Sequence, residues 1–272
     1  MFEKLDTETF DGLRCIIYEE TGISLGSHKE ALVQARVAKR LRALGLHSYE
    51  AYLSLLEADE TGAELTLFVD AICTNVTSFF REAHQFDFVD DQMRRWLDEG
   101  QRRFRFWSCA CSSGEEPYSL AMTLLHATAD HDDVDMRILA TDLSTKVLDR
   151  CLDGSYPSNR LDGVPEGWVD RFFVPVKTGH GQILKVAPPV RDMVLFRRMN
   201  LSMPPFPMQG PLDIAFCRNV MIYFDDAVRV ALLTEIHRML RPGGYLIVGH
   251  AESLSGINVD FKYLRPAIYV KK

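Results

Sequence analysis

The sequence predicts an α/β protein in which a parallel, doubly wound sheet carries a small antiparallel insertion and follows a small all-helical N-terminal domain. Three observations predict this fold class. The 272 residues are 47% hydrophobic, enough to bury a sizeable core. Residues 1–75 have helical periodicity and little strand signal, whereas apolar strand-like runs alternate with helical segments from residue 103 onward. Such alternation is typical of a parallel sheet.

The N-terminal domain is expected at residues 1–75. Its clearest helix is LVQARVAKRLRAL, whose apolar residues recur at helical spacing. This stripe consists of Val33, Val37, Leu41 and Leu44. Residues 76–102 are expected to be a connecting segment with a helix of its own, which ends at Gly100.

The α/β domain is expected at residues 103–272. Its first half reads as the strand FRFWSCA, a helix with Pro117 in the permitted first turn, the strand MRILATD and the helix STKVLDRCL. Its second half reads as the strand LDIAFC, the helix DAVRVALLTEIHRML, the strand GYLIVGH and one last short strand in the tail. Between about residues 153 and 192, clustered Gly, Pro, Asn and Asp interrupt the pattern, and short β-like pieces predict a small antiparallel insertion.

Composition excludes several classes of function. A net charge of −7 argues against general nucleic-acid binding, which needs a basic face. The first residues, MFEKLDTETF, do not resemble a signal peptide, and no apolar run approaches the roughly 18 residues of a membrane span. Six scattered cysteines predict reduced thiols in a cytoplasmic protein, with a zinc site as the weaker alternative.

The loop CACSSGEE, which follows the first strand of the α/β domain, predicts the kind of ligand. Ligands of open α/β sheets bind beyond the carboxyl ends of the strands. Glu115 and Glu116 would repel phosphate at the start of a helix, but they suit a cationic ligand. Asp142 ends the next strand, where an acid commonly binds ribose hydroxyls. A cationic nucleoside without phosphate fits both features, and S-adenosylmethionine is such a molecule. The alternative is that the glutamates only cap the helix.

Five segments carry a family resemblance: TNVTSFFRE (74–82), SSGEEPYSLA (112–121), ATD (140–142), MNL (199–201) and FCRNVMIYFD (216–225). Together they resemble the CheR family of chemotaxis receptor methyltransferases, and the likeness extends over nearly the whole chain. The resemblance implies a Rossmann-like S-adenosylmethionine-dependent methyltransferase sheet with a β insertion behind a helical domain. It also implies a protein-glutamate O-methyltransferase that modifies the cytoplasmic helices of bacterial chemoreceptors and so tunes adaptation in chemotaxis signal transduction. S-adenosylhomocysteine is the implied product, and the enzyme would be recruited to membrane receptor arrays.

The resemblance also implies roles for single residues. Arg81 and Tyr223 are the expected catalytic residues, and Arg81 would either pair with the cofactor carboxylate or steer the substrate glutamate. Either Glu115 or Glu116 would bind the ammonium group, and Asp142 the ribose. The other expected cofactor-binding residues are Asn75, Thr77, Asn200, Leu201, Arg218 and Asn219. For Arg81 a surface salt bridge is the alternative, and for Tyr223 a place in the core.

Two surfaces are candidates for receptor docking. The first is a basic helical face formed by Lys29, Arg36, Lys39 and Arg40, for which a solvated helix face is the alternative. The second is the β insertion, where the resemblance implies strand addition by a receptor's C-terminal peptide in some members. No membrane insertion is expected.

The nucleophile implied by the resemblance is a glutamate carboxylate, which is ionised near neutral pH because its ordinary pKa is about 4.3. No general base is therefore needed, no histidine lies in these motifs, and no metal is predicted. Two other functions remain open: a small-molecule carboxyl methyltransferase, and a sensor that binds S-adenosylmethionine without turnover.

Overall fold

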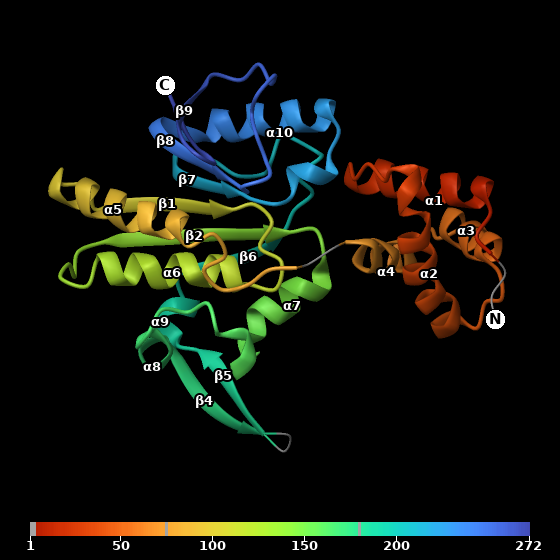
Figure 1. The fold of residues 1–272 in the computed structure, drawn as a ribbon, viewed down its shortest axis with the longest axis horizontal. Helices are drawn as coiled ribbons and strands as arrows, with labels where there is room; N and C mark the ends of the chain where they lie inside the picture. Colours follow the sequence, from red (N-terminus) through yellow and green to blue (C-terminus); the bar gives the residue numbers. More distant parts are fainter. Residues whose placement is uncertain (1–3, 74–75, 179–180) are drawn as a thin grey trace.

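The computed structural model describes residues 4–73, 76–178 and 181–272 of the chain. A bundle of short helices stands beside a larger α/β body, and the carboxyl ends of the parallel strands point toward the bundle (Figure 1). A small sheet projects from the larger body. Within the described residues no helix is long and apolar enough to cross a membrane.

The bundle contains four α-helices that share one apolar core. These are α1 (Thr7–Thr21), α2 (Glu30–Leu44), α3 (Tyr49–Glu57) and α4 (Ala63–Ile72). Val33, Val37 and Leu41 of the predicted stripe are buried in this core. Leu44, the last residue of the stripe and of α2, is 40% exposed. The helix ends there, because Gly45 adopts a left-handed conformation with φ 69°.

The α/β body is built on a seven-stranded sheet with the order β6-β2-β1-β7-β8-β10-β9. The parallel part contains β1 (Arg103–Ser108), β2 (Asp135–Asp142), β6 (Val194–Arg198), β7 (Leu212–Cys217) and β8 (Leu240–Val248). The chain moves outward from β1 through β2 to β6, and then returns to place β7 on the other side of β1. The β1–β7 boundary is therefore the topological switch point, where a ligand site is expected.

Two features of this sheet were not predicted. The edge strand β6 lies in a short segment, VLFRR, that carries too few residues for a clear periodic signal. The tail forms two antiparallel strands, β9 (Phe261–Arg265) and β10 (Ile268–Lys271), instead of the single strand expected. The turn between them contains Ala267 with a positive φ of 62°, a conformation that the residue type does not suggest.

Helices cover both faces of the sheet (Figure 1). They are α5 (His84–Asp98), α6 (Glu115–Ala127), α7 (Thr145–Asp153) and α10 (Asp226–Met239). The helix of the segment 76–102, α5, packs beside α6 and contributes aromatic side chains to the core beneath one face. Trp96, for example, stacks on Phe104 of β1 at a centroid distance of 6.0 Å. The core on the other face is built around α10.

The insertion forms a three-stranded antiparallel sheet with the order β3-β5-β4. Its strands are β3 (Ser155–Pro157), β4 (Phe173–Thr178) and β5 (Gly181–Val186), and its short helices are α8 (Trp168–Phe172) and α9 (Pro188–Arg191). The 3₁₀ helix η2 (Ser158–Arg160) follows β3 and lies near the carboxyl end of the large sheet.

Candidate functional site

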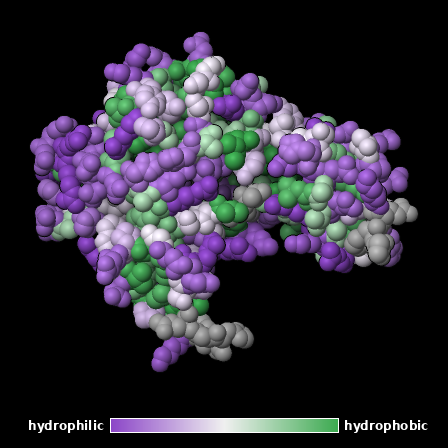
Figure 2. Space-filling model, viewed as in Figure 1, coloured by the Kyte–Doolittle hydropathy of each residue, from purple (hydrophilic) through white to green (hydrophobic). Residues whose placement is uncertain are grey.

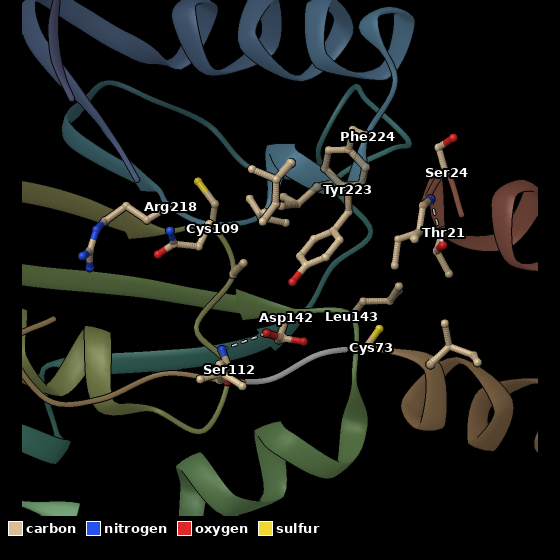
Figure 3. Close-up of a pocket in the computed structure, with 18 of the residues that line it drawn as sticks. Thr21, Ser24, Cys73, Cys109, Ser112, Asp142, Leu143, Arg218, Tyr223 and Phe224 are labelled. Atoms are coloured by element: carbon tan, nitrogen blue, oxygen red, sulfur yellow. Dashed lines mark hydrogen bonds between the residues drawn. The ribbon is translucent and has the colours of Figure 1, made fainter. Parts of the chain in front are cut away.

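A cavity of about 660 Å³ lies at the carboxyl ends of β1, β2 and β7, between the helical bundle and the α/β body (Figure 3). This volume falls in the range of ordinary ligand sites. Most residues predicted to bind the cofactor line it. They are Thr77, Arg81, Glu116, Asp142, Asn200, Leu201, Arg218 and Asn219, together with Tyr223. Asn75 lies outside the described residues.

Asp142 ends β2 and holds the glycine-containing loop in place. Its Oδ2 atom accepts a hydrogen bond from the Ser112 backbone N–H at 2.8 Å, and its Oδ1 atom accepts one from the Ser144 N–H at 3.0 Å. Each carboxylate oxygen has a second lone pair available for a ligand. Burial raises the pKa of the Asp142 carboxyl, although these N–H groups oppose the shift.

The two adjacent glutamates have different environments. Glu116 lines the cavity, whereas the Glu115 side chain is fully buried behind the wall and does not line it. Glu115 accepts hydrogen bonds from Arg160 and from the Ser113 hydroxyl. The helical period explains the separation, since neighbours on a helix point about 100° apart. Of the two glutamates between which the sequence left the choice open, Glu116 is the one that faces the cavity.

Arg218 is the centre of a buried charged network. Its Nη1 atom donates to Glu116 Oε2 at 2.8 Å, and its Nη2 atom donates to the backbone oxygen of Arg81 at 2.5 Å and lies 3.3 Å from Glu82. Burial raises the pKa of Glu116, although Arg218 and the hydroxyl of Ser108 oppose the shift. Arg218 therefore connects the loop after β1 with the segment that carries Arg81.

Two orphaned polar atoms indicate that the cavity is shaped for a polar ligand. The Ser112 Oγ and Arg218 Nε atoms are buried and have no hydrogen-bond partner within the described part of the chain, and both residues line the cavity. Buried polar groups are nearly always paired, so a ligand with polar groups at these points would satisfy them. The carboxylates of Glu116 and Asp142 match the ammonium group and ribose of S-adenosylmethionine, so the residues fit this cofactor.

Arg81 and Tyr223 enter the cavity from segments with unusual backbone conformations. Phe80 and Glu82, on either side of Arg81, have positive φ angles of 51° and 60°, and Asn219 has 55°. Such conformations in non-glycine residues cluster at functional sites. The Arg81 side chain donates to the backbone oxygen of Val76 at 3.0 Å, and no ion pair of Arg81 is found among the described residues. The Tyr223 ring projects into the cavity (Figure 3).

The helical bundle closes one side of the cavity and is attached beside Tyr223. The Ser24 backbone N–H donates to the Tyr223 backbone oxygen at 2.8 Å, and Ile23 forms an antiparallel bridge with Phe224. Asn200, which lines the cavity, also donates from its side chain to the backbone oxygen of Glu20 at 2.8 Å. The attachment therefore involves the same segments that form the site.

The four basic residues expected on one docking face have different environments. Arg36 lines the cavity and donates to the backbone oxygens of residues 71–73, which end α4. Arg40 forms a two-hydrogen-bond salt bridge with Glu64, which also accepts from the Tyr52 hydroxyl. Arg36 and Arg40 thus hold the bundle together, and the prediction of a shared exposed face is corrected for both. Lys29 and Lys39 are exposed.

Several residues of the cavity wall were missed by motif reasoning. His28, Ile23 and Ser24 come from the helical bundle and belong to no motif, so only the packing of the two domains reveals them. Glu252 accepts from the backbone N–H groups of Asn219 and Gly249 and fixes the turn after β7. Ser112 belongs to the loop CACSSGEE, but a small serine side chain does not by itself indicate contact with a ligand.

Comparisons with known proteins match both parts of the chain. Residues 8–73 match the family model for the CheR methyltransferase all-alpha domain, and residues 75–270 match that for the CheR methyltransferase SAM binding domain. The chain is 42% identical over 246 residues to chemotaxis protein methyltransferase 2 of Pseudomonas aeruginosa, with 90% of this chain and 86% of that protein covered.

Two enterobacterial relatives show similar agreement. The chemotaxis protein methyltransferase of Salmonella typhimurium is 37% identical over 254 residues, covering 93% of this chain and 86% of the relative. That of Escherichia coli is 36% identical over 254 residues, covering 93% and 87%. The cavity thus lies between a SAM binding domain and the all-alpha domain of the same family. The chain belongs to the CheR methyltransferase family, a family of S-adenosylmethionine-dependent enzymes.

Proposed function

We propose that this enzyme transfers a methyl group from S-adenosylmethionine to glutamate side chains of bacterial chemoreceptors and forms glutamyl methyl esters. One observation carries the proposal: a single cavity, in a member of the CheR family, collects Asp142, Glu116, Arg81 and Tyr223. The first two suit the cofactor, and the last two suit a carboxylate substrate.

The proposed reaction needs positioning more than proton transfer. When bound, S-adenosylmethionine supplies an electrophilic methyl group on a sulfonium. Glu116 and Asp142 are placed to orient the ammonium and ribose groups, while Arg81 is placed to attract the substrate carboxylate. Because the attacking carboxylate is already ionised near neutral pH, the residues lining the cavity need not remove a proton. Holding the reactants in line, away from water, would supply much of the rate.

We further propose a division of work between the domains. Residues 1–75 would dock the receptor, residues 76–102 would link the domains, and residues 103–272 would bind the cofactor. Lys29 and Lys39 are the exposed members of the expected docking set. Lys29 also lines the cavity, so the test uses two exposed positions of α2 that do not line it: Lys39→Glu with Arg42→Glu should lower kcat/KM for receptor and leave S-adenosylhomocysteine affinity unchanged. Wild-type receptor kinetics in this double variant would contradict the docking proposal.

The β insertion is a second proposed docking point, for a receptor's C-terminal peptide. Its edge strand β4 exposes Val174 and Val176, and the surface of the insertion is partly apolar (Figure 2). An extended peptide could pair with such an edge. The proposal includes action at the cytoplasmic side of membrane receptor arrays.

Labelled S-adenosylmethionine tests the main proposal. The protein is incubated with receptor-containing membranes, and base-labile label on receptor glutamates is the expected result. Label only in small molecules would favour a small-molecule carboxyl methyltransferase. Tight cofactor binding with no label transferred would favour a sensor.

A further inference from the structure

A salt bridge joins the β insertion to the wall of the cavity. Arg160 ends η2 in the insertion, and its Nη2 atom lies 2.5 Å from Glu115 Oε1. The Glu115 side chain is 0% exposed, whereas that of Arg160 is 45% exposed. The guanidinium group therefore covers a buried carboxylate that would otherwise need another counter-charge.

The same nitrogen also reaches a second segment of the wall. Arg160 Nη2 lies 3.5 Å from the backbone oxygen of Thr77, a cavity residue on the segment that leads to Arg81. Glu115 immediately precedes Glu116, a cavity residue in the first turn of α6. Arg160 thus contacts two segments that are distant in sequence and that converge on the cofactor cavity, although it does not line the cavity itself.

Tyr156, in the same insertion, contacts the same two parts of the chain as Arg160 does. The Tyr156 hydroxyl donates to the Ser113 backbone oxygen at 2.7 Å, and the Tyr156 ring packs edge-on against Phe79 at 4.9 Å. Gly114, with φ 97°, leaves room for this tyrosine, because a Cβ atom there would lie 2.7 Å from its hydroxyl. The insertion therefore packs tightly on the loop that begins α6 and on the segment before α5.

We propose that Arg160 is a positioning residue for the cofactor. By holding Glu115 and the Thr77 backbone together, it fixes the first turn of α6, which presents Glu116, opposite the segment that presents Arg81. This inference rests on the proposed cofactor site and extends it, since it makes the β insertion a structural part of that site in addition to a proposed docking module.

Arg160→Gln tests the inference. The substitution removes the charged hydrogen bond to Glu115 and leaves that carboxylate buried without its partner. We expect S-adenosylhomocysteine to bind about tenfold more weakly by isothermal titration, in line with the loss of one charged hydrogen bond. The KM for S-adenosylmethionine should rise, while kcat and the KM for receptor change little, because Arg160 does not line the cavity and lies outside the proposed docking edge β4.

A comparison of two ligands separates positioning from a simple charge effect. Loss of a positive charge near the cavity would by itself strengthen the binding of S-adenosylmethionine relative to that of S-adenosylhomocysteine. The reason is that the sulfonium of the first ligand is positive, whereas the sulfur of the second is uncharged. If Arg160 acts through loop position, both ligands should weaken by similar factors. Weakening of S-adenosylhomocysteine alone would overturn the positioning role.

Two further variants complete the design. Arg171→Gln is the matched control, because Arg171 lies in the same insertion and packs over Phe172, away from the cavity. It should keep wild-type affinity. Glu115→Gln should weaken S-adenosylhomocysteine binding as Arg160→Gln does. The double variant should bind little more weakly than either single variant, because both substitutions break the same salt bridge.

The possible outcomes are distinct. Wild-type affinity in folded Arg160→Gln would overturn the inference, as would additive effects in the double variant. If Arg160→Gln does not fold, Arg160→Lys replaces it. Lysine keeps the charge without the planar fork, so we expect weakened cofactor binding, and wild-type affinity again counts against the inference. If the wild-type protein does not bind S-adenosylhomocysteine, the proposed function itself fails, whatever the variants do.

Discussion

The carboxylates of Asp142 and Glu116 line one cavity but have different hydrogen-bond partners. Asp142 accepts from two backbone N–H groups, whereas Glu116 accepts from the Arg218 guanidinium and the Ser108 hydroxyl. Both pKa values are raised because burial disfavours the ionised form. Each carboxylate is thus costly to bury, and a cationic or hydroxyl-bearing ligand would offset part of that cost.

The first prediction at this scale concerns Asp142. Asp142→Ala should weaken S-adenosylhomocysteine binding by roughly 1.5–3 kcal/mol, because it removes hydrogen bonds between ribose hydroxyls and a charged group. Isothermal titration measures the change. Asp142→Asn keeps an acceptor for one backbone N–H and should retain more of the loop structure. Asp149→Ala, an exposed site on α7, is the control. Equal affinity in folded Asp142→Ala would mean that this acid does not bind the ribose.

The second prediction concerns pH. Hydroxyl and ammonium donors favour the ionised forms of Asp142 and Glu116, whose pKa values burial raises above the ordinary values of aspartate and glutamate. As pH falls through these raised values, the ligand must displace protons, so S-adenosylhomocysteine affinity should fall as the solution is acidified below neutral pH. Titration calorimetry across this range should also detect proton release on binding.

The effect of these two groups on folding stability has the opposite sign. A carboxyl whose pKa is raised in the folded state destabilises that state above the raised pKa, and the penalty fades as pH falls toward the ordinary value. Weaker binding at acidic pH would therefore not reflect destabilisation by Asp142 and Glu116. Affinity that is constant with pH would show that neither carboxylate changes protonation when the ligand binds.

The third prediction concerns Tyr223. Its ring lies in the cavity, and its backbone is held by Ser24, so loss of the hydroxyl should leave the fold intact. If the hydroxyl acts near the methyl group, Tyr223→Phe should lower kcat more than it raises the KM for cofactor. Steady-state kinetics with receptor membranes tests this. Wild-type turnover would assign Tyr223 a packing role.

At the scale of elements, α2 shows that basic residues on one helix can serve different purposes. Arg36 caps the end of α4, where backbone oxygens lack helical partners, and Arg40 pairs with Glu64. The Glu64 side chain is only 10% exposed, and it also accepts from Tyr52. The helix is therefore tied to α4 by charge as well as by its apolar stripe.

The fourth prediction follows from this pairing. Arg40→Ala should reduce the free energy of unfolding by about 2–4 kcal/mol, because Glu64 loses its partner in a largely buried place. Urea unfolding measures the loss. Lys39→Ala is the neighbouring control and should stay within about 0.5 kcal/mol of wild type. A similar small effect for Arg40→Ala would show that Glu64 finds water or another partner.

At the scale of the whole molecule, the cavity has walls from both domains. Residues 21–36 of the bundle and the turn at residues 218–224 face each other across it and are joined at Ser24 and Tyr223. A ligand that contacts both walls should stabilise their contact, because it binds only the assembled form.

The fifth prediction tests this coupling. Hydrogen exchange should slow in both domains when S-adenosylhomocysteine binds, including backbone amides near Ile23 and near Asn219. Mass spectrometry of peptides from each domain measures it. Protection confined to the α/β body would show that the bundle does not take part in cofactor binding. The α3 helix, remote from the cavity, serves as an internal reference.

The fold class and the chemistry expected of the site could be predicted from the order of residues alone. The alternation of apolar runs and helices predicted the parallel sheet, since both periods are local properties. The loop with Glu115 and Glu116 and the strand ending in Asp142 indicated a cationic nucleoside, because the carboxyl ends of parallel strands meet at one edge. The resemblance to the CheR family, carried by five short segments, is confirmed by matches over both domains.

Which of these side chains meet became clear from the folded structure and could not be predicted from the order of residues. It placed Glu116 in the cavity and Glu115 beneath Arg160, and it engaged Arg36 and Arg40 inside the bundle. It also brought residues of the bundle to Tyr223, across about two hundred positions of sequence. The physical reason is that pairing and burial depend on contacts between distant segments. Local periodicity and residue type indicate which interactions a side chain can form. The fold determines which partner is close enough to form them.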